Sequence, residues 1–176
     1  MSEDTAYEEA RTCAHRILKQ REKSSHDLLK RLQEKGHTLA ASEKVVDRFI
    51  EVGLVDDPRF TEAYIRSAQY SGKGWYRILR ELRQRGIDTD PLEPPPDCDE
   101  LERASQVIAR KSVSTLKERE KALRRLVMKG YSYGIARQAI AARVEMLDVS
   151  AAGADIQAED DSAENEVFSS PFDVRF

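Results

Sequence analysis

The 176-residue sequence lacks the features that mark several classes of protein. It has no apolar run approaching the roughly 18 residues that a membrane-spanning helix requires. Its first residues, Met-Ser-Glu-Asp-Thr, are acidic where a secretory signal peptide is basic. We therefore expect a soluble, cytoplasmic protein with no membrane partner.

Clusters of metal-binding or catalytic residues are also missing. The two cysteines, Cys13 and Cys98, have no metal-ligand spacing, which favours buried core residues or free thiols over a disulfide. The three histidines stand apart from one another and from any nucleophile. Asp56 and Asp57 could form a metal pair, but the following Pro58 favours a helix start that Asp57 caps. The sequence therefore predicts no enzyme, no cofactor and no metal site.

Helical periodicity is what the sequence does contain, most clearly in the stretch 73–86. Four apolar residues recur there at i, i+3, i+4 and i+7: Trp75, Ile78, Leu79 and Leu82. The other faces carry Arg77, Arg80, Arg83 and Arg85, against the single acid Glu81. Gly86 stands where the helix should stop, since glycine adopts the left-handed C-terminal conformation without steric cost. The stretch predicts a short, strongly cationic helix.

The same frame occurs three times. Its apolar positions and terminal glycine are Leu28, Leu29, Leu32 and Gly36, then Ile78, Leu79, Leu82 and Gly86, then Ala122, Leu123, Leu126 and Gly130. Two basic positions match as well, as Lys30, Arg80 and Arg124 and as Lys35, Arg85 and Lys129. The second trio also suits a purely local role, because cations in a last turn offset the helix dipole. Three copies indicate tandem helical units.

Flanking apolar stripes complete the units. Ser24 with Asp27, and Thr115 with Glu118, are capping-box arrangements that should open the second helices of the first and third units. The remaining helices of these units should begin near Ser42, at Asp97 or Asp99, and near Ser132. We place the three-helix repeats at 1–54, 55–96 and 97–147, the second with a proline-rich connector.

A longer set of residues spans the second unit: Val55-Asp56-Asp57-Pro58-Arg59-Phe60, Tyr64, Arg66, Lys73-Gly74, Arg77-Ile78, Glu81-Leu82 and Arg85-Gly86-Ile87. This pattern resembles the RecX family, bacterial regulatory proteins of the RecA recombinase. The resemblance continues into the first unit at Arg21-Glu22-Lys23-Ser24, Asp27-Leu28 and Lys35-Gly36, and covers roughly residues 8–147. It implies an all-α fold, an elongated tandem array of three three-helix repeats.

The chain departs from the family pattern after Gly86. A third helix is expected there, but Pro91 and the run Pro94 to Pro96 remove amide donors and clash with a preceding turn. We expect that helix to shrink to a turn, followed by a polyproline-like connector. The orientation of the third unit on the second stays open.

The family resemblance also implies a function. The protein would lodge in the groove of the RecA–DNA filament and restrain filament growth, ATP hydrolysis, strand exchange and the coprotease activity that triggers the SOS response. The alternative is a sequence-tolerant helical-repeat module that binds single- or double-stranded DNA without a recombinase partner. In either case we expect a monomer.

The cationic second helices suggest where the partner binds. The net charge of −3 conceals a body, residues 11–147, with 28 Lys and Arg against 20 Asp and Glu. We predict a recombinase or DNA contact set of Lys73, Trp75, Tyr76, Arg77, Arg80, Arg83, Lys117, Lys121, Arg124 and Arg125. The spacing predicts that Trp75 lies in the core, whereas the neighbouring Tyr76 falls outside the apolar stripe. An exposed aromatic among arginines could stack on bases or pack into a partner protein.

Residues 148–176 form an acidic end with eight acids and one arginine. Their low apolar content predicts a disordered tail. Such a tail could fold back and compete with DNA for the cationic body, or it could only keep the protein soluble.

Overall fold

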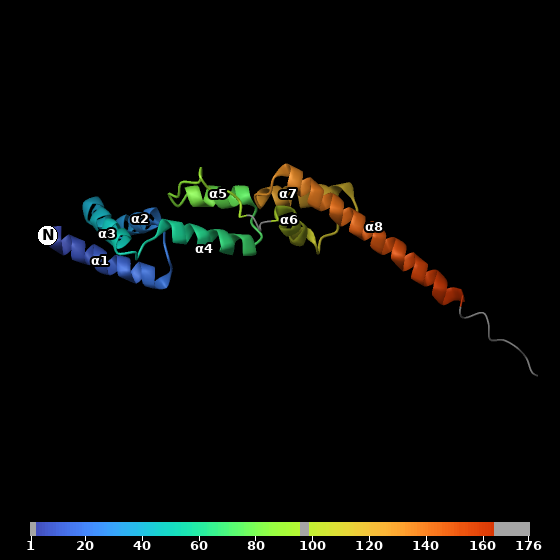
Figure 1. Ribbon diagram of the computed structural model, residues 1–176, viewed down its shortest axis with the longest axis horizontal. Coiled ribbons are helices and arrows are strands. Elements are labelled where there is room, and N and C mark those ends of the chain that lie inside the picture. The colour runs from blue at the N-terminus through green and yellow to red at the C-terminus, as the bar shows by residue number, and fades with distance from the viewer. Residues whose placement is uncertain (1–2, 96–98, 164–176) are drawn as a thin grey trace, which may run out of the picture.

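The structure, a computed structural model, describes residues 3–95 and 99–163. Across those ranges all regular structure is helical, in eight helices, which confirms the predicted all-α class. Figure 1 shows the helices strung along one long axis, as the elongated array requires. Three separate hydrophobic cores lie along that axis.

The first core joins helices α1 (Glu3–Gln20), α2 (Ser25–Glu34) and α3 (Leu39–Glu51). Its most completely buried large side chains are Leu28 and Leu32 of α2 and Val45 of α3. Small residues of α1, Ala10 and Ala14, are also fully buried, which lets that helix pack closely on the other two.

The second core joins only two helices, α4 (Asp57–Tyr70) and α5 (Trp75–Arg83). Ile78 and Leu82 of α5 are fully buried against α4. No helix follows α5 within residues 84–95, which confirms the predicted loss of the third helix. Ile87 and Leu92 of that segment still pack on this core. Pro96 and Cys98 lie outside the described residues.

The third core joins α6 (Glu100–Ile108), α7 (Leu116–Met128) and α8 (Tyr133–Ala163). Figure 1 shows α8 continuing well beyond the body of the molecule. The sequence predicted that this helix would end near residue 147 and that disorder would follow. The structure instead carries the helix to Ala163, and residues 164–176 lie outside the described part of the chain.

Most of the predicted helix starts are confirmed. The hydroxyls of Ser24 and Thr115 accept the amides of Asp27 and Glu118, and Asp99 accepts the amide of Glu102. Helix α3 begins earlier than predicted, because Thr38 and not Ser42 provides its cap.

The cap of α4 differs from the prediction. Asp56, not Asp57, accepts the amide of Arg59 and caps the helix. The Asp57 carboxylate instead accepts the backbone amide and the hydroxyl of Ser25, at 2.8 and 2.6 Å. It thereby connects the start of α4 to the start of α2.

Two further findings concern the part of the chain that the structure describes. None of the helices there is both long enough and apolar enough to cross a membrane. No group of three or more His, Cys, Asp or Glu side chains in those ranges lies close enough to hold a metal ion.

Candidate interaction surface

The N-terminus of α5 is capped by the third unit. Its N-cap residue, Gly74, has no side chain with which to satisfy the first free amides. The amide of Gly74 donates to the carbonyl of Lys129 at 2.8 Å, and that of Tyr76 donates to the carbonyl of Gly130 at 3.2 Å. The amide between them, of Trp75, donates to the Glu100 carboxylate at 2.7 Å. Three amides at the start of α5 therefore depend on α6 and on the end of α7.

Two glycines make this contact possible. A Cβ on Gly74 would lie 2.3 Å from the carbonyl carbon of Gly130. A Cβ on Gly130, whose φ is +93°, would lie 2.3 Å from the Cβ of Arg77. Any side chain at either position would push the two backbones apart.

The opposite end of α5 also meets the start of another helix, in the first unit, through different groups. The hydroxyl of Ser24, at the start of α2, donates to the carbonyl of Arg85 at 2.8 Å. The Arg85 guanidinium pairs with Asp27 at 3.1 Å. Gly86 again stands at the close approach, because a Cβ there would lie 2.4 Å from the Cβ of His26.

The two contacts arrange α7, α5 and α2 end to end, and we call these three helices the second-helix row (Figure 1). The C-terminus of each helix meets the N-terminus of the next, so the helix dipoles run in one direction. This row defines the orientation of the third unit on the second, which the proline-rich connector had left open.

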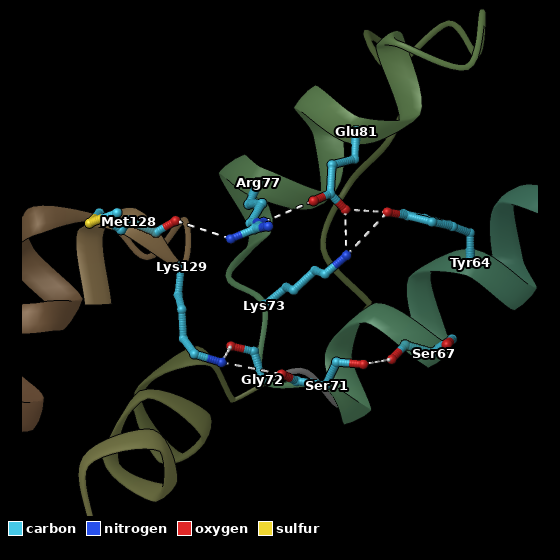
Figure 2. A network of polar contacts seen from close by, with 9 residues as sticks. All are labelled: Tyr64, Ser67, Ser71, Gly72, Lys73, Arg77, Glu81, Met128 and Lys129. Atoms are coloured by element: carbon cyan, nitrogen blue, oxygen red, sulfur yellow. Dashed lines mark hydrogen bonds and ion pairs between the residues drawn. The ribbon is translucent and has the colours of Figure 1, made fainter. Parts of the chain in front are cut away.

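A polar network around Glu81 lies beside the junction of α5 and α7 (Figure 2). One carboxylate oxygen accepts the ammonium of Lys73 at 2.6 Å and the hydroxyl of Tyr64. The other accepts the Arg77 guanidinium at 2.8 Å, and Arg77 also reaches the carbonyl of Met128 at 3.4 Å. The single acid of α5 thus neutralises Arg77 of the same helix and Lys73 of the turn that precedes it.

The network shifts the pKa of its acid. Burial of the Glu81 carboxyl opposes its ionisation, but the hydrogen bonds from Lys73, Tyr64 and Arg77 outweigh that effect and lower its pKa to about 2. The hydrogen bond to Glu81 in turn raises the pKa of Lys73. Both groups are charged across the neutral range.

The end of α7 is crowded with cations. Lys129 donates to the carbonyls of Ser71 and Gly72, both at 3.3 Å. Burial lowers the pKa of Lys129, and so do the nearby charges of Arg125, Arg77 and Lys73.

The predicted contact set divides into internal and exposed residues. Lys73 and Arg77 belong to the Glu81 network, and Trp75 is only 8% exposed within the second core. Arg83 is exposed and pairs with Asp90 at 3.3 Å. Arg124 is exposed, at 4.0 Å from Glu120. The members that are exposed and make no ion pair within the described ranges are Tyr76, Arg80, Lys117, Lys121 and Arg125.

One exposed cation recurs at the same repeat position of every helix in the row. These residues are Lys30 on α2, Arg80 on α5 and Arg124 on α7. The row therefore presents matched positive charges along its length.

A basic hollow between α1 and α2 was missed by the predicted contact set. It has a volume of about 710 Å³ and also receives Arg85 from α5. Its two acids are each paired with a cation of the same hollow, Asp27 with Arg85 and Glu34 with Arg31. Five lining cations make no ion pair with described residues: Arg16, Arg21, Lys23, Lys30 and Lys35.

The sequence contained a signal for this hollow. Lys30 occupies the same position of the repeat frame as Arg80 and Arg124. Because the predicted contact set contained Arg80 and Arg124, the repeat also pointed to Lys30. Arg16 lies on α1 and Arg21 directly follows the end of that helix, and only the packing of α1 on α2 places them beside Lys30.

Comparison with known sequences gives a consistent set of similarities. Residues 56–91 match the family described as RecX, second three-helix domain. A protein named Regulatory protein RecX from Halorhodospira halophila is 35% identical over 153 residues, which cover 82% of this chain and 95% of that one. Another of the same name, from Thermobifida fusca, is 33% identical over 150 residues, covering 79% of this chain and 80% of the other.

Comparison with solved structures reveals the same fold. The crystal structure of RecX from Lactobacillus salivarius superposes with a TM-score of 0.66 at 20% identity, covering 83% of this chain and 99% of that chain. A second crystal structure, of a regulatory protein RecX, superposes with a TM-score of 0.63 at 19% identity, covering 77% and 71% of the two chains.

Proposed function

This chain belongs to the RecX family of regulatory proteins, and from that premise we propose that it regulates the RecA recombinase by binding in the groove of the recombinase–DNA filament. Binding there would restrain filament growth, ATP hydrolysis, strand exchange and SOS coprotease activity. The mechanism is preferential binding to one state of the filament, which needs no chemical step.

The observation that carries this proposal is the second-helix row. A groove on a nucleoprotein filament is long and repetitive, so a protein that follows it needs contacts spread along one direction. The row supplies them, because α7, α5 and α2 continue one another and each exposes a matched cation. Exposed cations favour a partner surface that carries carboxylates or phosphates.

The basic hollow extends the same surface. Four of its unpaired cations, Arg16, Arg21, Lys23 and Lys30, suit phosphate groups, and the two arginines provide the planar donor geometry that binds phosphate oxygens in pairs. No aromatic side chain lines the hollow, so we expect contact with a phosphate backbone and not with stacked bases. DNA within the filament is a suitable source of such phosphates.

A second candidate function is DNA binding without a recombinase partner, and the basic hollow is the observation that favours it. The two functions separate experimentally. A recombinase regulator should lower the ATPase rate of a preformed filament at concentrations where it does not bind bare DNA. A DNA-binding module should act only at concentrations that saturate the DNA.

The row is tested by reversing its charge. We expect the double variant Arg80→Glu with Arg124→Glu to lose inhibition of the filament ATPase by about tenfold or more while keeping its thermal stability. Exposed substitutions of this kind change stability by only about 0.5 kcal/mol. The matched control is Lys19→Glu with Arg66→Glu, which makes the same charge change at exposed positions of α1 and α4. Equal inhibition by the row variant and the control would overturn the proposal.

A further inference from the structure

The second-helix row has one end without a docked helix. Where α5 and α7 end, a Cβ on the terminal glycine would collide with the next helix at 2.4 and 2.3 Å. At Gly36, where α2 ends, a Cβ would meet no described atom within 4 Å. Lys35 holds the repeat position of Arg85 but is exposed and makes no ion pair with described residues. The close approach of a helix start, which the other two terminal glycines share, is therefore absent at Gly36 among the described residues.

The occupied junction between α5 and α2 defines what such an end accepts. The incoming helix start supplies a hydroxyl N-cap, Ser24, which donates to the carbonyl before the glycine. It also supplies an acid at the third helical position, Asp27, which pairs with the terminal cation Arg85. An occupant of the α2 end needs the same two groups to meet the carbonyl and ammonium of Lys35.

The opposite end of the row carries both groups. Helix α7 begins with the N-cap Thr115 and has Glu118 at its third position. The Thr115 hydroxyl accepts the amide of Glu118, as the Ser24 hydroxyl accepts that of Asp27. Hydrogen bonds from the Thr115 amide and the Ser112 hydroxyl lower the pKa of Glu118, so the carboxylate is charged.

The surroundings of the two ends differ in charge. An open hollow of about 810 Å³ lies beside Lys35 and His37. It is lined by Arg16 and by two acids of α1, of which Glu8 pairs with Arg11 at 2.9 Å and Glu9 makes no ion pair with described residues. The segment that leads into α7 instead carries two exposed cations, Arg110 and Lys111. Each end also exposes a leucine, Leu39 at 51% after the α2 end and Leu116 at 79% in the first turn of α7.

We propose that a second copy of this chain docks the start of its α7 on the end of α2, so that Glu118 of one copy pairs with Lys35 of the next. The contact repeats the one between α5 and α2 with the same helix polarity. Because it joins two different surfaces, it does not close into a symmetric dimer, and successive copies continue the row.

The contact is small, and small interfaces are weak and transient. Isolated protein should therefore remain monomeric when dilute and associate as its concentration rises. Copies held side by side on one long partner would meet at a far higher effective concentration. The inference concerns association alone, so its test needs neither a recombinase nor DNA.

The first test exploits the amine and carboxyl at the contact. Carbodiimide coupling joins a lysine amine to a carboxylate without a spacer. A mixture of unlabelled and isotope-labelled protein should yield a mixed-isotope peptide pair that joins Lys35 to Glu118. Lys35→Arg should associate normally but lose the crosslink, because it keeps the charge and removes the amine. Coupling of other lysines between copies without this pair would overturn the proposal.

The second test uses charge reversal and mixing. Lys35→Glu alone and Glu118→Lys alone each place like charges at the contact. Each variant should weaken association about fivefold, as measured by sedimentation, which is the upper range for one exposed ion pair. Mixing the two variants restores opposite charges between unlike copies and should restore association. Lys19→Glu is the control for net charge and should associate as the natural chain does. Failure of the mixture to recover would overturn the proposal, whatever the stability of the separate variants.

Discussion

Glu81 shows how one side chain decides which cations remain available to a partner. Its carboxylate is only 16% exposed and accepts hydrogen bonds from Lys73, Tyr64 and Arg77. Lys73 and Arg77 are therefore part of the structure of the second unit. Arg80, which lies one turn after Arg77 on α5, makes no ion pair within the described ranges and is therefore available to an external partner.

We expect Glu81→Gln to lower the free energy of unfolding at pH 7 by roughly 3 kcal/mol, the equivalent of a pKa lowered from 4.5 to about 2. The lowered pKa means that the stabilisation is fully present above about pH 4.5 and is lost as the pH falls towards 2. Urea unfolding at pH 7 and at pH 3 measures both effects. The variant should lose less stability than the natural chain between these two values.

The exposed Glu43, which makes no ion pair with described residues, provides the control for this measurement. Glu43→Gln should leave the stability at pH 7 and its pH dependence nearly unchanged. If Glu81→Gln behaves like Glu43→Gln, the carboxylate does not hold the network together.

At the scale of the elements, α5 depends on its neighbours for its first turn. A helix of nine residues is marginal on its own, and this one begins at a glycine that offers no side-chain cap. The carbonyls of Lys129 and Gly130 and the carboxylate of Glu100 complete its first turn. The second and third units are therefore joined by the hydrogen bonds that α5 needs in order to form.

Two glycine-to-alanine substitutions distinguish the effect of a collision at this junction from the cost of placing alanine at a positive φ. Gly36 and Gly130 both have positive φ, at +89° and +93°, so alanine should cost each about 1–2 kcal/mol. Gly130→Ala adds a collision with Arg77, whereas Gly36→Ala meets nothing within 4 Å. We expect Gly130→Ala alone to accelerate hydrogen exchange at the amides of Gly74 and Tyr76. Equal exchange in the two variants would show that the junction tolerates a side chain.

Local signals in the sequence were sufficient for most helices but not for the contacts between them. The caps at Ser24 and Thr115 follow from residues three positions apart, and the prolines after Gly86 predict the missing helix. The hydrogen bond that the Ser25 hydroxyl donates to Asp57 joins residues 32 positions apart, and the ion pair of Arg85 with Asp27 joins residues 58 apart. Such pairs depend on how the units dock, which no local pattern encodes.

The length of α8 was also underestimated from the sequence. Residues 148–163 contain alanines, which favour helix, together with acids and one glycine. Counting apolar residues predicted disorder, but a helix without an apolar stripe can still continue from one that is already formed, because only the first turn is costly to nucleate.

At the scale of the whole molecule, the charge is arranged by region. The basic hollow of the first unit and the acidic continuation of α8 lie at opposite ends of the long axis (Figure 1). That the acidic end competes with DNA for the cationic body stays a prediction. Within one copy, α7 lies closer to this acidic end than the basic hollow does.

The hollow predicts a defined salt dependence. If Arg16 and Lys30 each contact a phosphate of single-stranded DNA, replacing either with alanine should reduce the slope of log affinity against log salt by about 0.7. Titrations at several salt concentrations measure that slope. Lys19→Ala, an exposed cation of α1 outside the hollow, should leave the slope unchanged. An unaltered slope in the hollow variants would mean that DNA phosphates bind elsewhere.

The capping of α5 by the third unit has a consequence for synthesis on the ribosome. The chain emerges from its N-terminus, and domains ordinarily fold in that order. Here α5 emerges before Lys129 and Gly130 have been added, so the amides of Gly74, Trp75 and Tyr76 first face water. The second unit is therefore completed only when the third emerges, and a nascent chain halted between them carries a helix whose first turn has no partner.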